Sequence, residues 1–280
     1  MEKLDWRSAC RMGLVLAFAL NAGTCRLRGG SPVLVGKQVP ASQKVALGVI
    51  QHDAWTALLQ KYVDQQGNVN YKAWKANAAS IQALDNYLAH LSKAKIGSRN
   101  SVEAQLAYWI NAYNAVTIKG ILREYPTSSI RNHTAWLIGY NIWKDLKLQV
   151  DRQQVSLDAM EHEILRKLGE PRIHFAIVCA SVSCPKLQRW AFEAEKLDEQ
   201  LTTAAEEFFA DTSKNRFDAS SGRVQLSQIL SWFGDDFGDT SADQMRFFAK
   251  YAPATARSLL VGGRAKVSYA KYNWGLNEQK

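Results

Sequence analysis

The chain has no cluster of basic residues, although its formal net charge is +9 over 280 residues. Lysines and arginines are spread singly and alternate with acidic residues, as at Lys144, Asp145 and Lys147. Because nucleic acids bind clustered cations that release counterions, this distribution argues against a nucleic-acid partner. The chain also lacks internal repeats and low-complexity tracts, so we expect a single domain.

No apolar run near the N-terminus is long enough to span a bilayer. The run over residues 12–20 falls short of the ~20 residues that a membrane helix needs. Basic residues precede it and small residues follow it, which is the pattern of a secretory signal peptide over residues 1–24. A linker over residues 25–43 would lead to a folded domain over residues 44–280. We expect a periplasmic or secreted protein whose only membrane contact is through the signal segment.

Cysteine is scarce, with four residues in the chain. Removal of a signal peptide would take Cys10 away, and acylation of Cys25 in a lipoprotein is disfavoured because no leucine stands three residues before it. A chain of this length can bury a sizeable core without a disulfide framework. Cys179 and Cys184 remain, and they could form a small disulfide if the turn between them is tight.

The composition is ordinary for a globular protein, with 47% hydrophobic and 22% charged residues. We expect a helix-rich α+β fold with a small sheet around a central apolar helix over residues 101–125, for which Asn100 and Glu103 would form a capping box. Other helices are predicted at 52–63, 74–91, 156–168, 191–211 and 241–251, strands at 69–71 and 265–274, and a hairpin at 216–226.

The apolar, β-branched run over residues 173–178 predicts a buried strand that delivers Cys179 onto a turn of small residues. Side chains alternate along a strand, so His174 and Cys179 would face opposite sides and could not pair. A base for Cys179 would then come from elsewhere. His162, on the preceding predicted helix, is the leading candidate.

These residues suggest a thiol-dependent hydrolase or acyl transferase in which Cys179 is the nucleophile and His162 the base. Asn114 would donate to the oxyanion or orient the base. Each residue also has a structural interpretation: an inert packed thiol, a core histidine, and an amide that holds a loop backbone. A zinc-binding helix needs a second histidine four residues after the first, and His162 has none at that position. The sequence implies no metal or other cofactor.

Two further functions stay open from the sequence. Asn111, Tyr113 and Ser183 are candidate substrate-binding residues, and a non-enzymatic envelope domain could bind a peptide, glycan or small molecule in a groove of aromatic residues. The candidate groove residues are Trp109, Tyr113 and Trp143. The third possibility is a dithiol redox protein that uses Cys179 and Cys184.

Four ordered motifs, at residues 108–115, 156–166, 174–185 and 269–277, together resemble the family catalogued as domain of unknown function 547. The resemblance spans most of residues 50–277. It implies an exported domain in bacteria and a module joined to other domains in plants. For such a helix-rich domain, with one prominent cysteine and one prominent histidine, a papain-like or transglutaminase-like fold is an expectation. In those folds the cysteine usually opens a helix, whose dipole lowers the thiol pKa. The same effect in this chain requires a helix to begin at Ser181 or Ser183.

Overall fold

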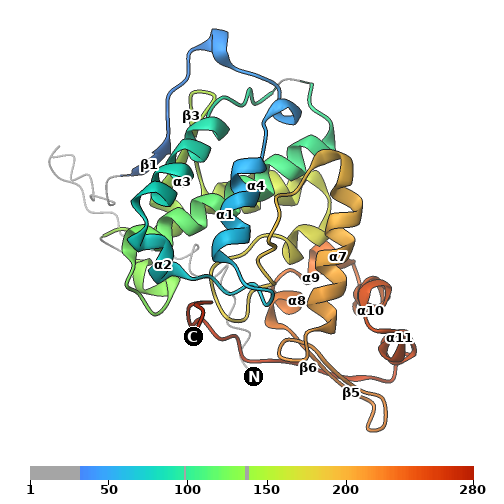
Figure 1. Cartoon of the computed structure of the whole chain (residues 1–280). Helices are drawn as coiled ribbons and strands as arrows, with labels where there is room; N and C mark the ends of the chain where they lie inside the picture. Colours follow the sequence, from blue (N-terminus) through green and yellow to red (C-terminus); the bar gives the residue numbers. More distant parts are fainter. Residues whose placement is uncertain (1–31, 98, 136–138) are drawn as a thin grey trace, which may run out of the picture.

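The computed structural model describes residues 32–97, 99–135 and 139–280, and its arrangement confirms the predicted helix-rich α+β class (Figure 1). The predicted signal peptide, residues 1–24, lies outside the described residues. The helices are α1 (Asp53–Tyr62), α2 (Tyr71–Ala76), α3 (Ala78–Leu91), α4 (Val102–Glu124), α5 (Ile142–Asp145), α6 (Leu157–Ala159), α7 (Leu197–Ala210), α8 (Gln228–Trp232), α9 (Gly234–Phe237), α10 (Ser241–Tyr251) and α11 (Ala254–Val261).

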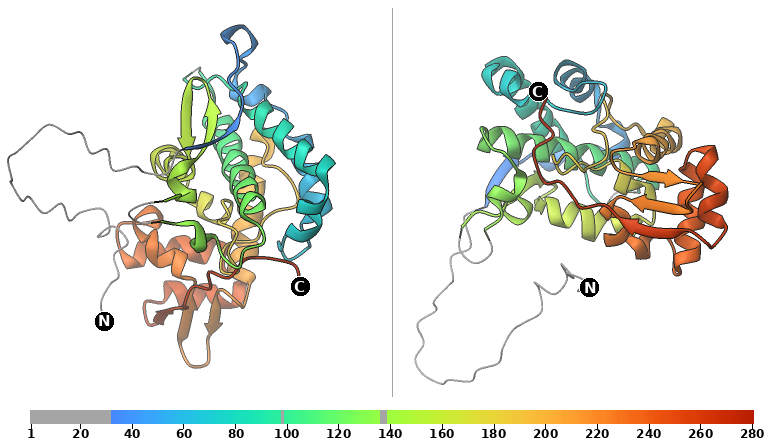
Figure 2. Two further views of the ribbon diagram at one scale, coloured as in Figure 1. Left: turned by 90° about the vertical axis from the view of Figure 1, so that its left-hand side faces the viewer. Right: turned by 90° about the horizontal axis from the view of Figure 1, so that it is seen from below.

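Helix α4 runs through the middle of the molecule, with α1, α2 and α3 on one side and α7 on the other (Figures 1 and 2). Most of its 23 residues are buried, as the predicted central apolar helix requires. The predicted capping box is wrong by one residue. Ser101 is the N-cap and accepts a hydrogen bond from the Ala104 N–H at 3.1 Å. The Asn100 side chain instead accepts from the Leu47 N–H and fixes the preceding loop.

The predicted helix over residues 74–91 is divided in two at Asn77. The Asn77 side chain accepts from the Ser80 N–H at 2.9 Å and caps α3, while α2 begins earlier, at Tyr71. Because local side-chain hydrogen bonds compete with helical ones, an asparagine favours such a boundary. The predicted strand at 69–71 is reduced to an isolated bridge between Val69 and Glu278.

Two three-stranded sheets flank the helical core, in the orders β1-β2-β3 and β4-β5-β6. The first begins inside the predicted linker, where Val35 of β1 is buried and pairs with Leu148. The second contains the predicted hairpin. The strands are β1 (Val33–Gly36), β2 (Leu146–Val150), β3 (Gln153–Ser156), β4 (Arg216–Asp218), β5 (Arg223–Leu226) and β6 (Lys266–Tyr269).

The helix predicted over residues 156–168 begins and ends where expected, but its central part is not an α-helix. Ser156 caps it, accepting from the Ala159 N–H, and Gly169 ends it with φ +74°. Between them, Met160–Leu165 forms a π-helix. A π-turn inserts an extra residue per turn and so rotates the side chains that follow it, and such turns are frequent at functional sites.

The chain after β6 crosses back over the molecule as an extended strap, residues 270–279 (Figure 2). It joins distant parts of the sequence, since the Val69 N–H donates to the Asn277 carbonyl at 2.8 Å and the Asn277 N–H donates to the Ala180 carbonyl at 3.1 Å. The strap therefore fixes the loop that carries the two cysteines. Over the described ranges, no helix combines the length and the apolar character needed to cross a membrane.

Candidate functional site

The segment before Cys179 is buried but is not a strand, so that prediction is wrong. Pro171–Phe175 is a 3-10 helix, and residues 176–179 have no regular structure. The Asn114 amide explains why: its Nδ2 donates to the Ala176 carbonyl at 2.9 Å and its Oδ1 accepts from the Val178 N–H at 2.8 Å. A side chain of α4 thus satisfies the backbone groups that a neighbouring strand would have paired.

Cys179 and Cys184 are paired as a disulfide with Cα atoms 6.3 Å apart. Cys179 is partly exposed, whereas Cys184 is buried at 4% exposure. Ala180, between them, adopts φ +58°, a conformation that costs a non-glycine residue about 1–3 kcal/mol. Hydrogen bonds with the strap hold this turn, among them Val182 N–H to the Gly275 carbonyl, Ser183 N–H to the Asn273 carbonyl and Asn277 N–H to the Ala180 carbonyl.

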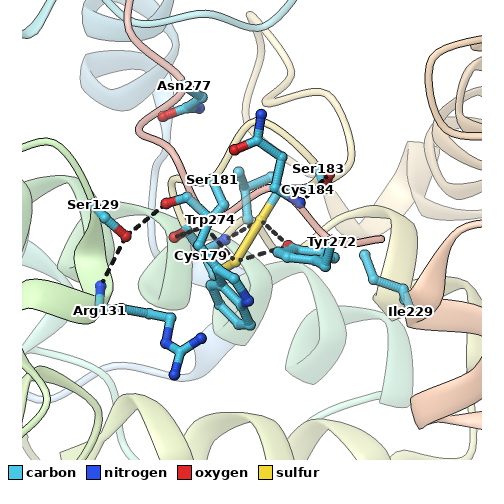
Figure 3. The surroundings of a disulfide bond; sticks show 12 residues. Ser129, Arg131, Cys179, Ser181, Ser183, Cys184, Ile229, Tyr272, Trp274 and Asn277 are labelled. Atoms are coloured by element: carbon cyan, nitrogen blue, oxygen red, sulfur yellow. Dashed lines mark hydrogen bonds between the residues drawn. A yellow bond between two sulfur atoms is a disulfide. The ribbon is translucent and has the colours of Figure 1, made fainter. Parts of the chain in front are cut away.

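The hydroxyl of Tyr272, on the strap, touches both sulfurs (Figure 3). It lies 3.3 Å from Sγ of Cys179 and 3.1 Å from Sγ of Cys184. Burial raises the pKa of Tyr272, so this hydroxyl stays protonated and can donate. The rings of Trp274 and Trp232 pack on Tyr272 at centroid distances of 4.5 and 4.8 Å, and together they form an aromatic surface beside the disulfide.

The carboxyl group of Glu161 acts on Tyr272 of this aromatic surface. The π-helix presents Glu161, which accepts a hydrogen bond from the Tyr113 hydroxyl at 3.1 Å. Burial raises the pKa of Glu161 to about 7, although the Tyr113 hydrogen bond and the Arg166 charge oppose the shift. The Glu161 charge in turn adds to the raised pKa of Tyr272. Glu161 can therefore take up or release a proton near neutral pH, and its charge acts on Tyr272.

Glu161→Gln is expected to remove a pH dependence of stability. The unfolded carboxyl ionises near its ordinary value of 4.5 and the folded one near 7, so stability falls as pH rises through this window and stays lower above it. At pH 8 the variant should be more stable than the native protein by about 3 kcal/mol, and below pH 4.5 the two should agree. Urea unfolding measured against pH tests this. Glu163→Gln, an exposed neighbour, should retain the native pH profile.

A second polar group lies on the other side of the same segment. Arg166 donates to both carboxylate oxygens of Asp236 at 2.6 Å, and Nε2 of His174 lies 2.7 Å from the same carboxylate. Burial lowers the pKa of His174, so the ring is neutral at pH 7 and donates its Nε2–H to Asp236. His162 lies beside Arg166, with Nδ1 3.4 Å from its guanidinium. This group ties α9 to the 3-10 turn Arg166–Leu168, directly after the π-helix, and to the 3-10 helix Pro171–Phe175.

The residues that the hydrolase hypothesis joined have other hydrogen-bond and packing partners in the structure. Within the described ranges, the hydrogen-bond partners of the two sulfurs include no imidazole; they are Ser181, Tyr272 and the Cys179 N–H. His162 instead packs near Phe233, and burial lowers its pKa. The Asn114 amide binds backbone groups with both of its polar atoms, as in the structural interpretation of this residue.

The predicted substrate-binding residues are also engaged inside the fold. The Asn111 amide binds the backbone of Phe192 in the same way as Asn114 binds its loop. Its Nδ2 donates to the Phe192 carbonyl at 2.8 Å, and its Oδ1 accepts from the Phe192 N–H at 2.9 Å. Tyr113 is 2% exposed, and Ser183 accepts from the Asn273 N–H of the strap. Trp109 is buried as well, so the predicted groove of Trp109, Tyr113 and Trp143 does not form. Only Trp143 is partly exposed.

Four residues of the site are not among those that the sequence singles out: Glu161, Trp232, Tyr272 and Trp274. Glu161 is next to His162 in the motif at 156–166, and Tyr272 and Trp274 belong to the motif at 269–277, so their presence in these motifs was the available signal. Trp232 lies outside the four motifs. What was missing was the contact between segments almost a hundred residues apart, since Cys179 and Tyr272 are separated by 93 positions.

Residues 98–209 match the model of a family described as "Protein of unknown function, DUF547". The chain resembles this family. The DUF547 match includes α4, the π-helix and both cysteines, whereas Tyr272 and Trp274 lie beyond it. No curated protein and no solved structure matches the chain. No helix begins at Ser181 or Ser183, so the feature that lowers the thiol pKa in papain-like folds is not found here.

Proposed function

We propose that this protein exchanges its Cys179–Cys184 disulfide with the thiols of a substrate. The observation that carries the proposal is the asymmetry of the pair: Cys179 is partly exposed, Cys184 is buried, and a single tyrosine hydroxyl touches both sulfurs. Exchange requires an accessible sulfur to accept the incoming thiolate and a leaving sulfur whose thiolate is stabilised. The two cysteines and Tyr272 meet both requirements.

In the proposed reaction, a substrate thiolate attacks Sγ of Cys179 and forms a mixed disulfide, while the bond to Cys184 breaks. The Cys184 thiolate accepts a hydrogen bond from the Tyr272 hydroxyl, which stabilises the leaving group. A second substrate thiolate then attacks the substrate sulfur of the mixed disulfide and releases Cys179. Two electrons and two protons pass from the substrate dithiol to the protein, which ends as a dithiol, and the substrate ends as a disulfide.

Glu161 supports this reaction as a proton store. With a pKa of about 7, it is partly protonated at neutral pH and can exchange a proton with the sulfur site as the thiolates form. The predicted export agrees with the reaction, because disulfides persist in oxidising compartments.

Matched cysteine variants test the exchange. Cys184→Ser leaves the partly exposed thiol, and we expect it to form a mixed disulfide with oxidised glutathione at least about tenfold faster than Cys179→Ser, whose remaining thiol is buried. In the native protein, dithiothreitol should expose two alkylatable cysteines in the peptide that contains residues 179–184, as peptide mass spectrometry would show.

Equal reaction rates in the two variants would contradict the proposal. So would a pair that stays oxidised in glutathione buffers until the fold melts, because structural disulfides resist the glutathione pool. The hydrolase with Cys179 and His162 stays a prediction from the sequence. It requires activity on acyl substrates that Cys179→Ser abolishes and that does not depend on Cys184.

A further inference from the structure

Strand β6 is an outer strand with one open side. It pairs with β5 in parallel, with Val267 opposite Val224 and Tyr269 opposite Leu226, and it ends the strand order of its sheet. Figure 2 shows β6 at the rim of this sheet, with the chain continuing from it into the strap. Every residue of β6 is exposed, including Val267 and Tyr269 at 39% each.

The pairing with β5 determines which backbone groups are open. The Lys266 N–H donates to the Gly222 carbonyl at 2.9 Å and the Ala270 N–H donates to the Leu226 carbonyl at 2.8 Å. Successive residues of a strand point their N–H and C=O groups to opposite sides, so the groups of Val267 and Tyr269 point away from β5. No hydrogen bond within the described part of the chain engages either N–H. An extended backbone is the partner that this spacing fits.

The surroundings of β6 select the charge of that partner. Four exposed cations lie on or beside the strand, and none forms an ion pair within the described residues: Arg223, Arg264, Lys266 and Lys271. Unpaired cations of one sign along an edge favour an acidic partner and speed its association. The two exposed side chains of Val267 and Tyr269 favour apolar residues at alternate positions of the partner.

The strand also leads to the sulfur site. Tyr269 ends β6, and Tyr272, three residues on, touches both sulfurs. Three extended residues span about 10 Å. A small pocket of about 20 Å³ lies beside the strap, lined by Ala270, Lys271 and Tyr272 together with Ser183 of the cysteine turn and Ser213, Lys214, Ser227 and Gln228. A chain lying along β6 would therefore bring a cysteine at its end close to Cys179.

We propose that the open side of β6 binds an extended, acidic segment of a substrate polypeptide as a fourth strand and presents its cysteine to Cys179. This inference rests on the exchange reaction proposed above and names its substrate as a protein or peptide rather than a small thiol. The partner backbone pairs with Val267 and Tyr269, and the cations beside the strand contact its carboxylates.

Hydrogen exchange on a trapped complex gives the most direct test. The Cys184→Ser variant is linked through Cys179 to a synthetic decapeptide of alternating glutamate and valine with one cysteine. We expect the amides of Val267 and Tyr269 to become protected when the peptide is attached, whereas glutathione attached to the same thiol should leave them unprotected. Attachment without protection at these two amides overturns the β6 inference but leaves the exchange reaction intact. A peptide that does not attach at all counts against the exchange reaction itself.

A proline substitution tests the backbone contact in the otherwise native protein. Val267→Pro removes an N–H that points away from β5, and proline is tolerated in edge strands at such positions. Val267→Ala shortens the side chain but keeps the N–H. We expect Val267→Pro to bind the peptide about three- to tenfold more weakly than Val267→Ala, as the loss of one hydrogen bond implies. Equal affinities of two folded variants, checked by circular dichroism, would overturn the proposal.

Charge reversal on the two edges of the same sheet tests the chemistry of the partner. Lys266→Glu, on β6, should slow attachment of the acidic peptide and favour a lysine version of the same sequence. Arg216→Glu, on the opposite edge strand β4, makes the same charge change and should affect attachment less. Equal effects would indicate attraction by net charge alone and overturn the assignment. Sedimentation showing that β6 pairs with a second copy of this chain would overturn it too.

Discussion

Asn114→Ala is expected to destabilise the protein by about 3–5 kcal/mol, because it removes two buried hydrogen bonds and leaves both backbone partners unsatisfied. The side chain is 4% exposed, and its amide holds the Ala176 carbonyl and the Val178 N–H at 2.9 and 2.8 Å. These are the groups that position Cys179. We also expect faster reduction of the disulfide, since the segment before it would no longer be fixed to α4. Urea unfolding gives the first quantity, and timed alkylation gives the second.

The matched control is Asn86→Ala, an exposed asparagine on α3. Its loss should change stability by no more than about 0.5 kcal/mol, as is usual for surface positions. Asn114→Asp adds a finer test, because a carboxylate can accept from the Val178 N–H but cannot donate to the Ala176 carbonyl unless protonated. An Asn114→Ala variant as stable as the control would show that water replaces the amide and that its two hydrogen bonds to the backbone are dispensable.

Asp236→Ala is expected to cost about 3–4 kcal/mol of stability at neutral pH, because it leaves the partly buried charge of Arg166 without its counter-ion and the buried His174 N–H without an acceptor. His174 is 2% exposed, and the same carboxylate also binds both nitrogens of the Arg166 fork. Burial opposes ionisation of Asp236, but Arg166 and His174 more than offset it and lower the pKa of Asp236 well below its usual range. Chemical unfolding of the two proteins at pH 7 gives the difference directly.

The same pKa gives the sign of the pH dependence for Asp236→Ala. A carboxyl with a lowered pKa in the folded state contributes stability above its unfolded value of about 4, and this contribution is lost as pH falls. The native protein and Asp236→Ala should therefore converge in acid. Asp239→Asn, at a nearby exposed position, should match the native protein throughout. If the stability difference between the native protein and Asp236→Ala stays constant down to pH 3, the variant has lost packing rather than an ion pair.

Local pattern was enough to locate most helices and the hairpin. Residues 241–251 and 216–226 have the predicted bounds because capping residues and a polar turn mark their ends in the sequence. The buried central helix followed from its apolar composition. The predictions failed where a side chain from elsewhere satisfied the backbone. Residues 173–178 have the composition of a strand, but the amide of Asn114, more than sixty positions away, holds their polar groups.

The amino-acid sequence by itself determined the helix-rich class, the central helix and the motifs that contain the two cysteines, Glu161, Tyr272 and Trp274, because these depend on periodicity, caps and residue type over short distances. The tertiary structure alone decided which of these residues meet. Tyr272 reaches both sulfurs because the strap crosses the cysteine turn, and Glu161 of the π-helix accepts from the Tyr113 hydroxyl and raises the pKa of Tyr272. Contacts between segments so far apart depend on the packing of the whole chain, which no local pattern contains.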